Sequence, residues 1–257
     1  MLQQIDTIYL MYFAITETLK EEDAKHPLSH LYVSEILLAG MLYALRGVSF
    51  RRFYRWFKEL NILRTPERSR LERLIIHYRS YTDKFLAEES LFNITDSFGV
   101  EIIKPIRENR SRQSKNVSKK GQSNHRWIVG RKINVIINQK YEIISMQHET
   151  QNVCDNIFDD AIAVVKGIVL ADGNYRKKDN QTPENIKICP KGRWNERMGV
   201  ERLFSLWTRV CDAKESYHRT VKGFDAKARY LCALTNILLK LNDEYGFKHL
   251  SMVQWAF

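Results

Sequence analysis

The chain has 257 residues, 44% of them hydrophobic, and a formal net charge of +11. This length suits one large domain or two modest ones, and no stretch of eighteen uncharged apolar residues argues for a membrane span. The four cysteines form no CxxC pair, which argues against a structural zinc site and favours a reducing compartment. The large positive charge favours a polyanionic partner, most often nucleic acid.

Residues 1 to about 90 are predicted to form a helical bundle. The opening "MLQQIDTIYLMYFAITETLK" contains Asp6 and has no basic leader or small-residue cleavage site, so we expect an amphipathic helix rather than a signal peptide. In "SEILLAGMLYALRG", apolar residues recur at helical spacing, with Ser34 as the expected N-cap and Gly47 as the expected stop. A further helix is expected to begin at Thr65, with Pro66 at its first position.

One helix of this bundle is predicted to carry a basic face. In "VSFRRFYRWFKELNIL" the aromatic residues are spaced for a buried face, and Arg51, Arg52 and Arg55 fall opposite them. Cations gathered on one face of a helix are candidates for contact with phosphate groups.

Strand patterns begin near residue 91. "LFNITDSFGVEII" is rich in β-forming residues, and "WIVGRKINVIINQKYEIISMQH" predicts a hairpin that turns at residues 138–140. Between them, a segment at about 104–126 carries many cations and few apolar residues, so we expect a loop that is mobile until it binds a partner. A helix in "NVCDNIFDDAIAVV", a buried strand at 168–171, a short strand in "ENIKICP" and two amphipathic helices follow. Strands interleaved with helices predict an α/β fold, in which helices cover a mixed sheet.

Two acids stand where apolar strands are predicted to end. Asp96 follows the strand in "NITDSFGV", and Asp172 follows Ile168–Ala171 in "GIVLADGNY". If the two strands are neighbours, their carboxylates emerge close together, and a cation between them relieves their repulsion. Hard oxygen ligands favour Mg²⁺ or Mn²⁺ over zinc. The alternative is that each aspartate only forms a turn.

A third acid is expected from a helix packed against this sheet. In "RMGVERLFSLW", apolar residues including Val200 and Trp207 form the buried stripe, and Glu201 lies beside it. Arg197 lies four residues earlier, in position to orient Glu201 or to contact phosphate. Glu196 is the competing acid, and a solvent-facing or paired glutamate is the alternative for either.

Four blocks of the sequence together resemble a known family. "NITDSFGVEI", "GRKINVIINQKYEIISMQHETQNVCDN", "GIVLADGNY" and "RMGVERLFSLWTR" resemble the conserved blocks of insertion-sequence DDE transposases. Those proteins have a ribonuclease H-like catalytic domain of the retroviral integrase superfamily. The helical region "VSEILLAGMLYALRGVSFRRFYRWFKE" also resembles the part that precedes this domain in one branch of the family, so the resemblance covers residues from roughly 30 to 245.

The resemblance implies a fold, an active site and a reaction. It implies a helical DNA-binding region at 1–90 and a ribonuclease H-like DDE domain at 91–257. Asp96, Asp172 and Glu201 would be the catalytic triad, holding two Mg²⁺ or Mn²⁺ ions that cleave DNA at the transposon ends and transfer the 3′-hydroxyl to target DNA. By the same matching, Tyr175 is the aromatic residue after the second acid. The sequence departs from the family at Asn134 and Asn138, where a histidine and an aspartate are common.

The implied partner is double-stranded DNA, both the terminal inverted repeats and the target, bound by a homodimer or larger assembly. No membrane partner is expected, and the implied location is the prokaryotic cytoplasm, in association with the nucleoid. The N-terminal bundle is expected to recognise the transposon ends, while cations near the acids neutralise phosphates. The residues expected to contact DNA are Arg51, Arg52, Arg55, Lys104, Arg107, Arg110, Arg112, Lys119, Lys120, Arg126, Arg131, Lys132, Arg176, Lys177, Lys178, Arg193 and Arg197.

Other functions stay open from the sequence alone. A ribonuclease H-like nuclease without strand transfer would use the same acids, and an inactive transposase-derived protein would only bind DNA. A role unrelated to nucleic acid is the fourth alternative. His148 and His125 are candidates for acid–base groups, although His148 fits a surface or DNA-facing position. Trp194 and Trp207 are candidates for stacking on a flipped base, although the spacing of Trp207 favours the core.

Overall fold

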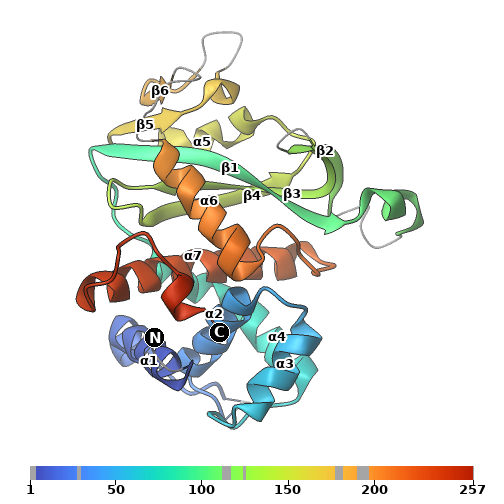
Figure 1. Ribbon diagram of the computed structural model, residues 1–257, viewed down its shortest axis with the longest axis vertical. Helices are drawn as coiled ribbons and strands as arrows, with labels where there is room; N and C mark the ends of the chain where they lie inside the picture. Colours follow the sequence, from blue (N-terminus) through green and yellow to red (C-terminus); the bar gives the residue numbers. More distant parts are fainter. Residues whose placement is uncertain are drawn as a thin grey trace. The chain divides into compact units, whose positions relative to one another are not determined.

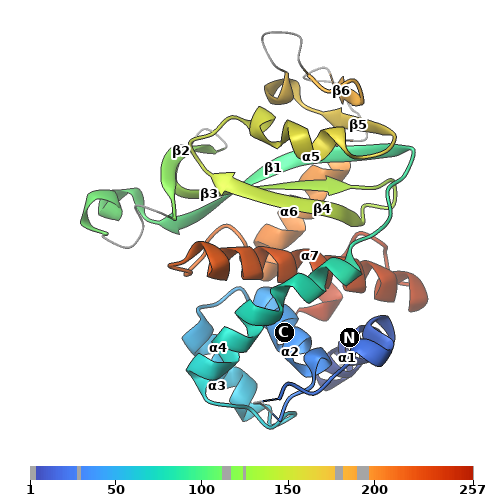
Figure 2. The same cartoon turned by 180° about the vertical axis from the view of Figure 1, so that it is seen from behind.

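The computed structural model describes residues 4–27, 30–111, 117–123, 126–176, 182–189 and 197–256. Internal contacts divide the chain into two units. Unit 1 consists of Met1–Leu86, Arg209–Asp212 and Val221–Phe257, and unit 2 of Ala87–Thr208 and Ala213–Thr220. Each unit is traced in Figures 1 and 2.

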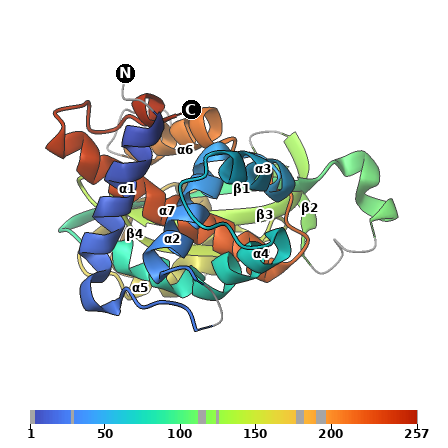
Figure 3. The ribbon, with the colours of Figure 1, turned by 90° about the horizontal axis from the view of Figure 1, so that it is seen from below.

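Unit 1 is a helical bundle built around α2. Its α-helices are α1 (Gln4–Leu19), α2 (Val33–Arg46), α3 (Phe50–Glu59), α4 (Arg68–His77) and α7 (Val221–Glu244). Short 3₁₀ helices lie at Lys20–Glu22, Tyr78–Phe85 and Val253–Trp255. Almost every residue of α2 is buried, and the helix packs against α1, α3, α4 and α7 (Figure 3). A helix that is apolar around most of its circumference needs neighbours on all sides, which the bundle provides.

The predicted helix limits are confirmed in part. Gly47 ends α2 in the left-handed conformation, with φ of +61°, as expected for a glycine stop. Two N-terminal predictions are wrong. Tyr32 rather than Ser34 is the N-cap of α2, and α4 begins at Arg68 after Glu67, whose side chain accepts a hydrogen bond from the amide of Ser69, rather than at Thr65. Neither Tyr32 nor Glu67 is among the residue types preferred at an N-cap, so cap preference alone did not select them.

The C-terminal helix α7 packs with the N-terminal helices, chiefly α2 and the Tyr78–Phe85 turn. The sequence-based division had grouped this segment with the strands at 91–257. An amphipathic pattern shows that a helix has a buried face, but it does not show which surface covers that face. In the described part of the chain, no single helix is both long and apolar enough to cross a membrane, and only α2 and α3 taken together, across a 119° bend, meet that length and composition.

Unit 2 is a six-stranded mixed sheet. Its strands are β1 (Phe92–Ile103), β2 (Lys119–Ser123), β3 (Arg126–Ile137), β4 (Ile143–Thr150), β5 (Ile168–Ala171) and β6 (Ile186–Ile188). The order is β2-β3-β1-β5-β6. β2 pairs with the first part of β3, and β4 pairs with the rest of β3. β1 runs antiparallel to β3 and parallel to β5. The curled mixed sheet and the helical region at the N-terminus confirm the predicted ribonuclease H-like α/β fold.

Helices cover both faces of this sheet. α5 (Asp159–Ala163) lies on one face and α6 (Met198–Cys211) crosses the other (Figures 1 and 2). Under α5, Ile162 packs with Ile136 and Val169 in one apolar cluster. On the opposite face, the ring of Phe98 in β1 lies 5.0 Å from that of Phe204 in α6. The predicted stripe of α6 is therefore confirmed as the side that packs on the sheet, with Trp207 fully buried.

Three segments of unit 2 differ from the sequence-based expectation. The basic segment was predicted as a loop, but its described residues form a 3₁₀ helix at Pro105–Arg110 and strand β2. The helix predicted in "NVCDNIFDDAIAVV" is a 3₁₀ turn at Asp155–Phe158 followed by the single short helix α5. Asp96 lies in the middle of β1 rather than at its end, because β3 continues the pairing through Ile103. The predicted hairpin of β3 and β4 is confirmed.

Candidate active site

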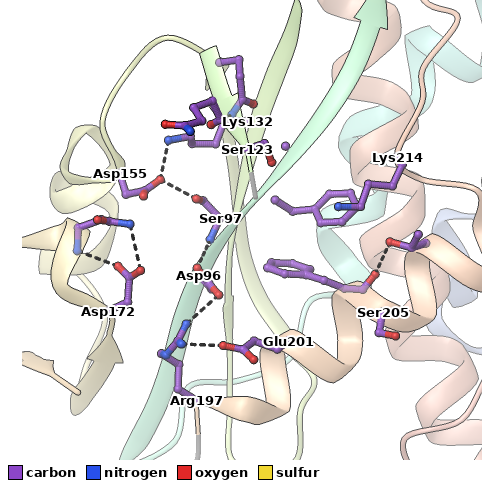
Figure 4. A pocket seen from close by; sticks show the side chains of 17 residues that line it. Asp96, Ser97, Ser123, Lys132, Asp155, Asp172, Arg197, Glu201, Ser205 and Lys214 are labelled. Carbon is purple, nitrogen blue, oxygen red and sulfur yellow. Dashed lines mark hydrogen bonds and ion pairs between the residues drawn. The ribbon is translucent and has the colours of Figure 1, made fainter. Parts of the chain in front are cut away.

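The sheet brings the two predicted aspartates to one edge of the same cleft. β1 and β5 are parallel neighbours whose last paired residues are Ile94 and Leu170, so Asp96 and Asp172 stand two residues beyond them on adjacent strands. Together with Glu201 of α6 they line one cavity of about 690 Å³ (Figure 4). Three acids distant in sequence therefore share one cavity.

Asp96 is the most confined of the three acids. Its side chain is 17% exposed, and its carboxylate accepts hydrogen bonds from the amide of Ser97 at 2.8 Å and from the guanidinium of Arg197 at 3.1 Å. Burial raises the pKa of Asp96 to about 7, with smaller upward contributions from the charges of Asp172 and Asp155. An additional cation nearby would stabilise the ionised form of this carboxyl.

Asp172 is fixed by the turn that follows β5. Its two carboxylate oxygens accept hydrogen bonds from the backbone amide and the side-chain amide of Asn174, at 2.9 and 3.1 Å. Burial raises the pKa of Asp172 as well, and the charge of Asp155 adds to this shift. Each acid therefore has a defined orientation and an electrostatic environment that disfavours its negative charge.

Arg197 connects the sheet acid with the helix acid. Its guanidinium lies 3.1 Å from the carboxylate of Asp96 and 2.6 Å from that of Glu201 (Figure 4). The ion pair with Glu201 spans one helical turn, the spacing noted from the sequence. In the part of the chain that the structure describes, no group of three or more His, Cys, Asp or Glu side chains is arranged to hold a metal ion. Here the positive charge between Asp96 and Glu201 is that of Arg197.

A fourth acid, Asp155, belongs to the site and was missed by sequence reasoning. It is 8% exposed, and one of its carboxylate oxygens accepts hydrogen bonds from the hydroxyl of Ser97 at 2.5 Å and the ammonium of Lys132 at 2.7 Å. Asp155 starts the 3₁₀ turn after β4, in a stretch with three nearby aspartates. The available signal was an acid just after the predicted hairpin, but nothing local distinguished it from Asp159 or Asp160.

A buried polar network supports β1 beneath Asp96. The side-chain amide of Asn134 in β3 donates hydrogen bonds to the hydroxyls of Tyr175 at 2.7 Å and Thr95 at 2.9 Å. All three side chains are essentially inaccessible to solvent. Burial is also the main reason that the pKa of Tyr175 lies well above its usual value. Asn134, a departure from the family pattern, is thus the residue that joins β3, β1 and the turn after Asp172.

Asn138, the other departure, is a turn residue away from the cavity. Its side-chain oxygen accepts hydrogen bonds from the amides of Lys140 and Glu142, and so closes the β3–β4 hairpin. His148 is half-buried, and its ring contacts the guanidinium of Arg131 at 3.0 Å. Neither lines the cavity that contains the acids.

The predicted DNA-contacting cations occupy different environments. Arg131 and Lys132 are buried, and their charged groups bind partners inside unit 2: the carbonyl of Val117 for Arg131, and Asp155 for Lys132. Arg197 is held by the acids. The structure therefore pairs the charged groups of all three side chains with groups of the protein itself. Arg131 and Lys132 are consecutive in β3, so their side chains point to opposite faces of the sheet. Both are buried because both faces of β3 are covered.

The other described cations of this set are exposed. Lys104 and Arg126 extend to Glu215 and Glu101 respectively, and Lys120 lies near Glu108. The remaining exposed residues are Arg51, Arg52, Arg55, Arg107, Arg110, Lys119 and Arg176. Several residues singled out from the sequence lie outside the described residues: Arg112, His125, Lys177, Lys178, Arg193, Trp194 and Glu196.

Comparison with protein families agrees with this geometry. A family model described as a transposase DDE domain matches residues 87–223, which is more than half of the chain. The matched span contains β1, β5 and α6, the elements that carry the three predicted acids. Among curated proteins, none matches the sequence. The family match, over a segment that folds around a carboxylate-lined cavity, establishes that the chain belongs to the DDE transposases.

Proposed function

We propose that the chain cleaves DNA at transposon ends in a reaction that requires divalent metal, and joins the freed 3′-hydroxyl to target DNA. Asp96, Asp172 and Glu201 are the proposed catalytic residues. The observation that carries the proposal is their presence on one cavity within the segment matched by the transposase family. DNA is the substrate that membership in this family implies.

The donor set is chemically suited to Mg²⁺ or Mn²⁺. All three side chains offer carboxylate oxygen, the ligand that these hard cations prefer. Burial raises the pKa values of Asp96 and Asp172, so a bound cation would stabilise the ionised form of both carboxyls. When bound, two such ions supply activation of the attacking oxygen and stabilisation of the leaving oxygen in an in-line displacement at phosphorus.

The protein's own residues prepare this site in three ways. Asn174 holds the Asp172 carboxylate in one orientation, and the Asn134 network holds the strand that carries Asp96. Arg197 neutralises Asp96 and Glu201. We propose that Arg197 leaves these two carboxylates when metal binds, and turns its guanidinium to the DNA phosphate. A planar guanidinium is well suited to both partners.

The test is a cleavage and joining assay with Asp172→Asn. The substrate is a labelled duplex that carries the inverted repeats flanking the gene, incubated with Mg²⁺ and a target plasmid. We expect DNA binding to survive and both cleavage and joining to fall by at least about 10²- to 10³-fold. Asp160→Asn is the matched control, because Asp160 is an exposed aspartate of the same unit outside the cavity.

The outcomes separate the proposal from its alternatives. Unchanged cleavage in Asp172→Asn would reject the catalytic assignment. Cleavage by the wild-type chain without any joined product would identify a nuclease. Binding without cleavage, over a range of Mg²⁺ and Mn²⁺ concentrations, would identify a DNA-binding protein that has lost catalysis.

A further inference from the structure

The cavity that contains the acids also contains a cation that has no anionic partner among the residues that the structure describes. Three cationic side chains line it: Lys132, Arg197 and Lys214. Lys132 is paired with Asp155, and Arg197 is paired with Asp96 and Glu201. Lys214 makes no ion pair with any residue that the structure describes, and its ammonium lies 4.9 Å from the centroid of the Phe98 ring.

Lys214 is held in this position by the backbone. The amide of Glu101 donates a hydrogen bond to the carbonyl of Lys214, and the amide of Ser216 donates one to the carbonyl of Glu101, both at 2.8 Å. The segment after α6 thus attaches to the outer edge of β1. Burial lowers the pKa of Lys214, and the charge of Arg126 lowers it further, which is the expected state of a cation without a nearby anion.

The edge of β1 is open between this attachment and β5. β5 pairs with β1 only from Phe92 to Ile94, and the segment after α6 pairs with β1 at Glu101. Along a strand, alternate amides point to the same edge. The amide of Glu101 points outward to Lys214, so the amide of Gly99 points outward as well, into the open stretch. Gly99 and Lys214 both line the cavity.

The spacing along β1 relates this open edge to the catalytic acids. Phe98, under the Lys214 ammonium, lies two residues beyond Asp96, a distance of about 7 Å along an extended strand. Successive phosphates of one DNA strand are separated by a comparable length. The spacing between Asp96 and the position beside Lys214 therefore matches that between adjacent phosphates.

We propose that Lys214, together with the backbone amide of Gly99, forms a subsite for the DNA phosphate next to the one that is cleaved. This inference rests on the proposed function for the identity of the substrate. Lys214 acts as a positioning residue, because it binds a phosphate that does not react. The hydroxyl-bearing residues Ser205 and Thr208 line the same wall of the cavity.

The first test measures binding and does not depend on catalysis. Lys214→Met keeps the apolar stem over Phe98 and removes the charge. With a short fluorescently labelled duplex, we expect roughly tenfold weaker binding at low salt, and a plot of log affinity against log salt that is less steep by about 0.9, the value for one lost phosphate contact. Lys166→Met is the matched control, since Lys166 is an exposed lysine of unit 2 that does not line the cavity.

The second test locates the contact on the DNA. Each phosphate around the cleavage site is replaced in turn by a neutral methylphosphonate. In the wild-type chain, neutralising the phosphate adjacent to the cleaved one should raise KM with little change in kcat. In Lys214→Met the same replacement should have no further effect. Lys214→Arg should restore most of the binding, because it restores the charge.

Two results would overturn the subsite. One is a salt dependence for Lys214→Met equal to that of the wild type and of Lys166→Met. The other is additive effects of Lys214→Met and every methylphosphonate position. Both can occur while the wild-type chain still cleaves DNA, so failure of the subsite is distinguishable from failure of the proposed function. If the wild type does not cleave, the salt measurement still decides whether Lys214 meets a phosphate.

Discussion

The floor and the opening of the candidate active-site cavity differ in how their charged groups are paired. On the floor, the ion pair of Asp155 with Lys132 and the network of Asn134 with Tyr175 are buried and satisfied by fixed protein partners. At the opening, Asp96 and Glu201 share one arginine, and Lys214 has a ring beneath it but no carboxylate partner in the described part of the chain. The charged and polar groups of the floor find their partners within the folded protein, whereas those at the opening would be stabilised further by bound ligands. Changes on the floor should therefore reduce stability, and changes at the opening should alter metal and DNA binding.

The largest effect on stability is expected from Asp155→Ala. The change leaves the ammonium of Lys132 buried without its carboxylate, in a pair whose side chains are only 10% and 11% exposed. Removing one partner of a buried ion pair costs about 3 to 5 kcal/mol of unfolding free energy. Chemical denaturation measures it, with Asp160→Ala as an exposed control. A loss below about 1 kcal/mol would show that the floor is not as rigidly paired as the structure indicates.

The next effect is a pH dependence that originates at the opening. Because the folded-state pKa of Asp96 is raised to about 7, the folded chain binds more protons than the unfolded chain between pH of about 4 and 7. The unfolding free energy of the metal-free protein should therefore fall as pH rises through this range, by on the order of 4 kcal/mol. Asp172, whose pKa is also raised, acts in the same direction.

The Asp96→Asn variant separates the contribution of Asp96 to the pH dependence of stability from that of the other titratable groups. Denaturation in the presence of a chelator, at several pH values from about 5 to about 8, should give a flatter profile for the variant than for the wild type. Added Mg²⁺ should stabilise the wild type most at the upper end of this range, where Asp96 is ionised. Identical profiles for the two proteins would mean that burial of Asp96 does not raise its pKa.

A smaller effect on stability is expected from Tyr175→Phe. The variant loses the hydroxyl that accepts a hydrogen bond from Asn134, at a cost of about 1 to 2 kcal/mol. Tyr230→Phe is a matched control, because the hydroxyl of Tyr230 makes one buried hydrogen bond, to the carbonyl of Ile75 in unit 1. If both variants are destabilised to a similar extent but only Tyr175→Phe cleaves DNA more slowly, the floor contributes to catalysis. Equal cleavage by both would restrict the network to folding.

The smallest effect is expected from Arg197→Met on metal affinity. In the absence of DNA, the guanidinium competes with metal for the carboxylates of Asp96 and Glu201. Its removal should tighten Mn²⁺ binding several-fold, equivalent to about 1 kcal/mol for a partly exposed pair. Titration calorimetry measures this, with Arg202→Met, on the exposed side of the same helix, as the control. Weaker Mn²⁺ binding in Arg197→Met would show that Arg197 supports the metal site instead of competing for it.

Periodicity and short motifs predicted much of this molecule. Strands β1, β3, β4, β5 and β6, the hairpin at residue 138 and the buried stripe of α6 followed from spacing, whereas β2 did not. The resemblance supplied Asp96, Asp172 and Glu201, and the structure places all three on one cavity. Asp155 could not be selected, because its role depends on Ser97 and Lys132, which are distant in sequence. Lys214 was missed for the same reason, since its place depends on the pairing of its backbone with Glu101.

The sequence by itself determined the class of fold, the basic character of the chain and the residue types that bind metal and phosphate. These are local properties, carried by the alternation of apolar residues, by charge and by short motifs. Only the tertiary structure decided which charges are available. It buried Arg131 and Lys132, placed Arg197 between two acids, and left Lys214 facing the cavity. Whether a charged side chain is free to bind a ligand depends on which segments pack around it. Long-range strand pairing and helix packing decide this, and no local sequence pattern does.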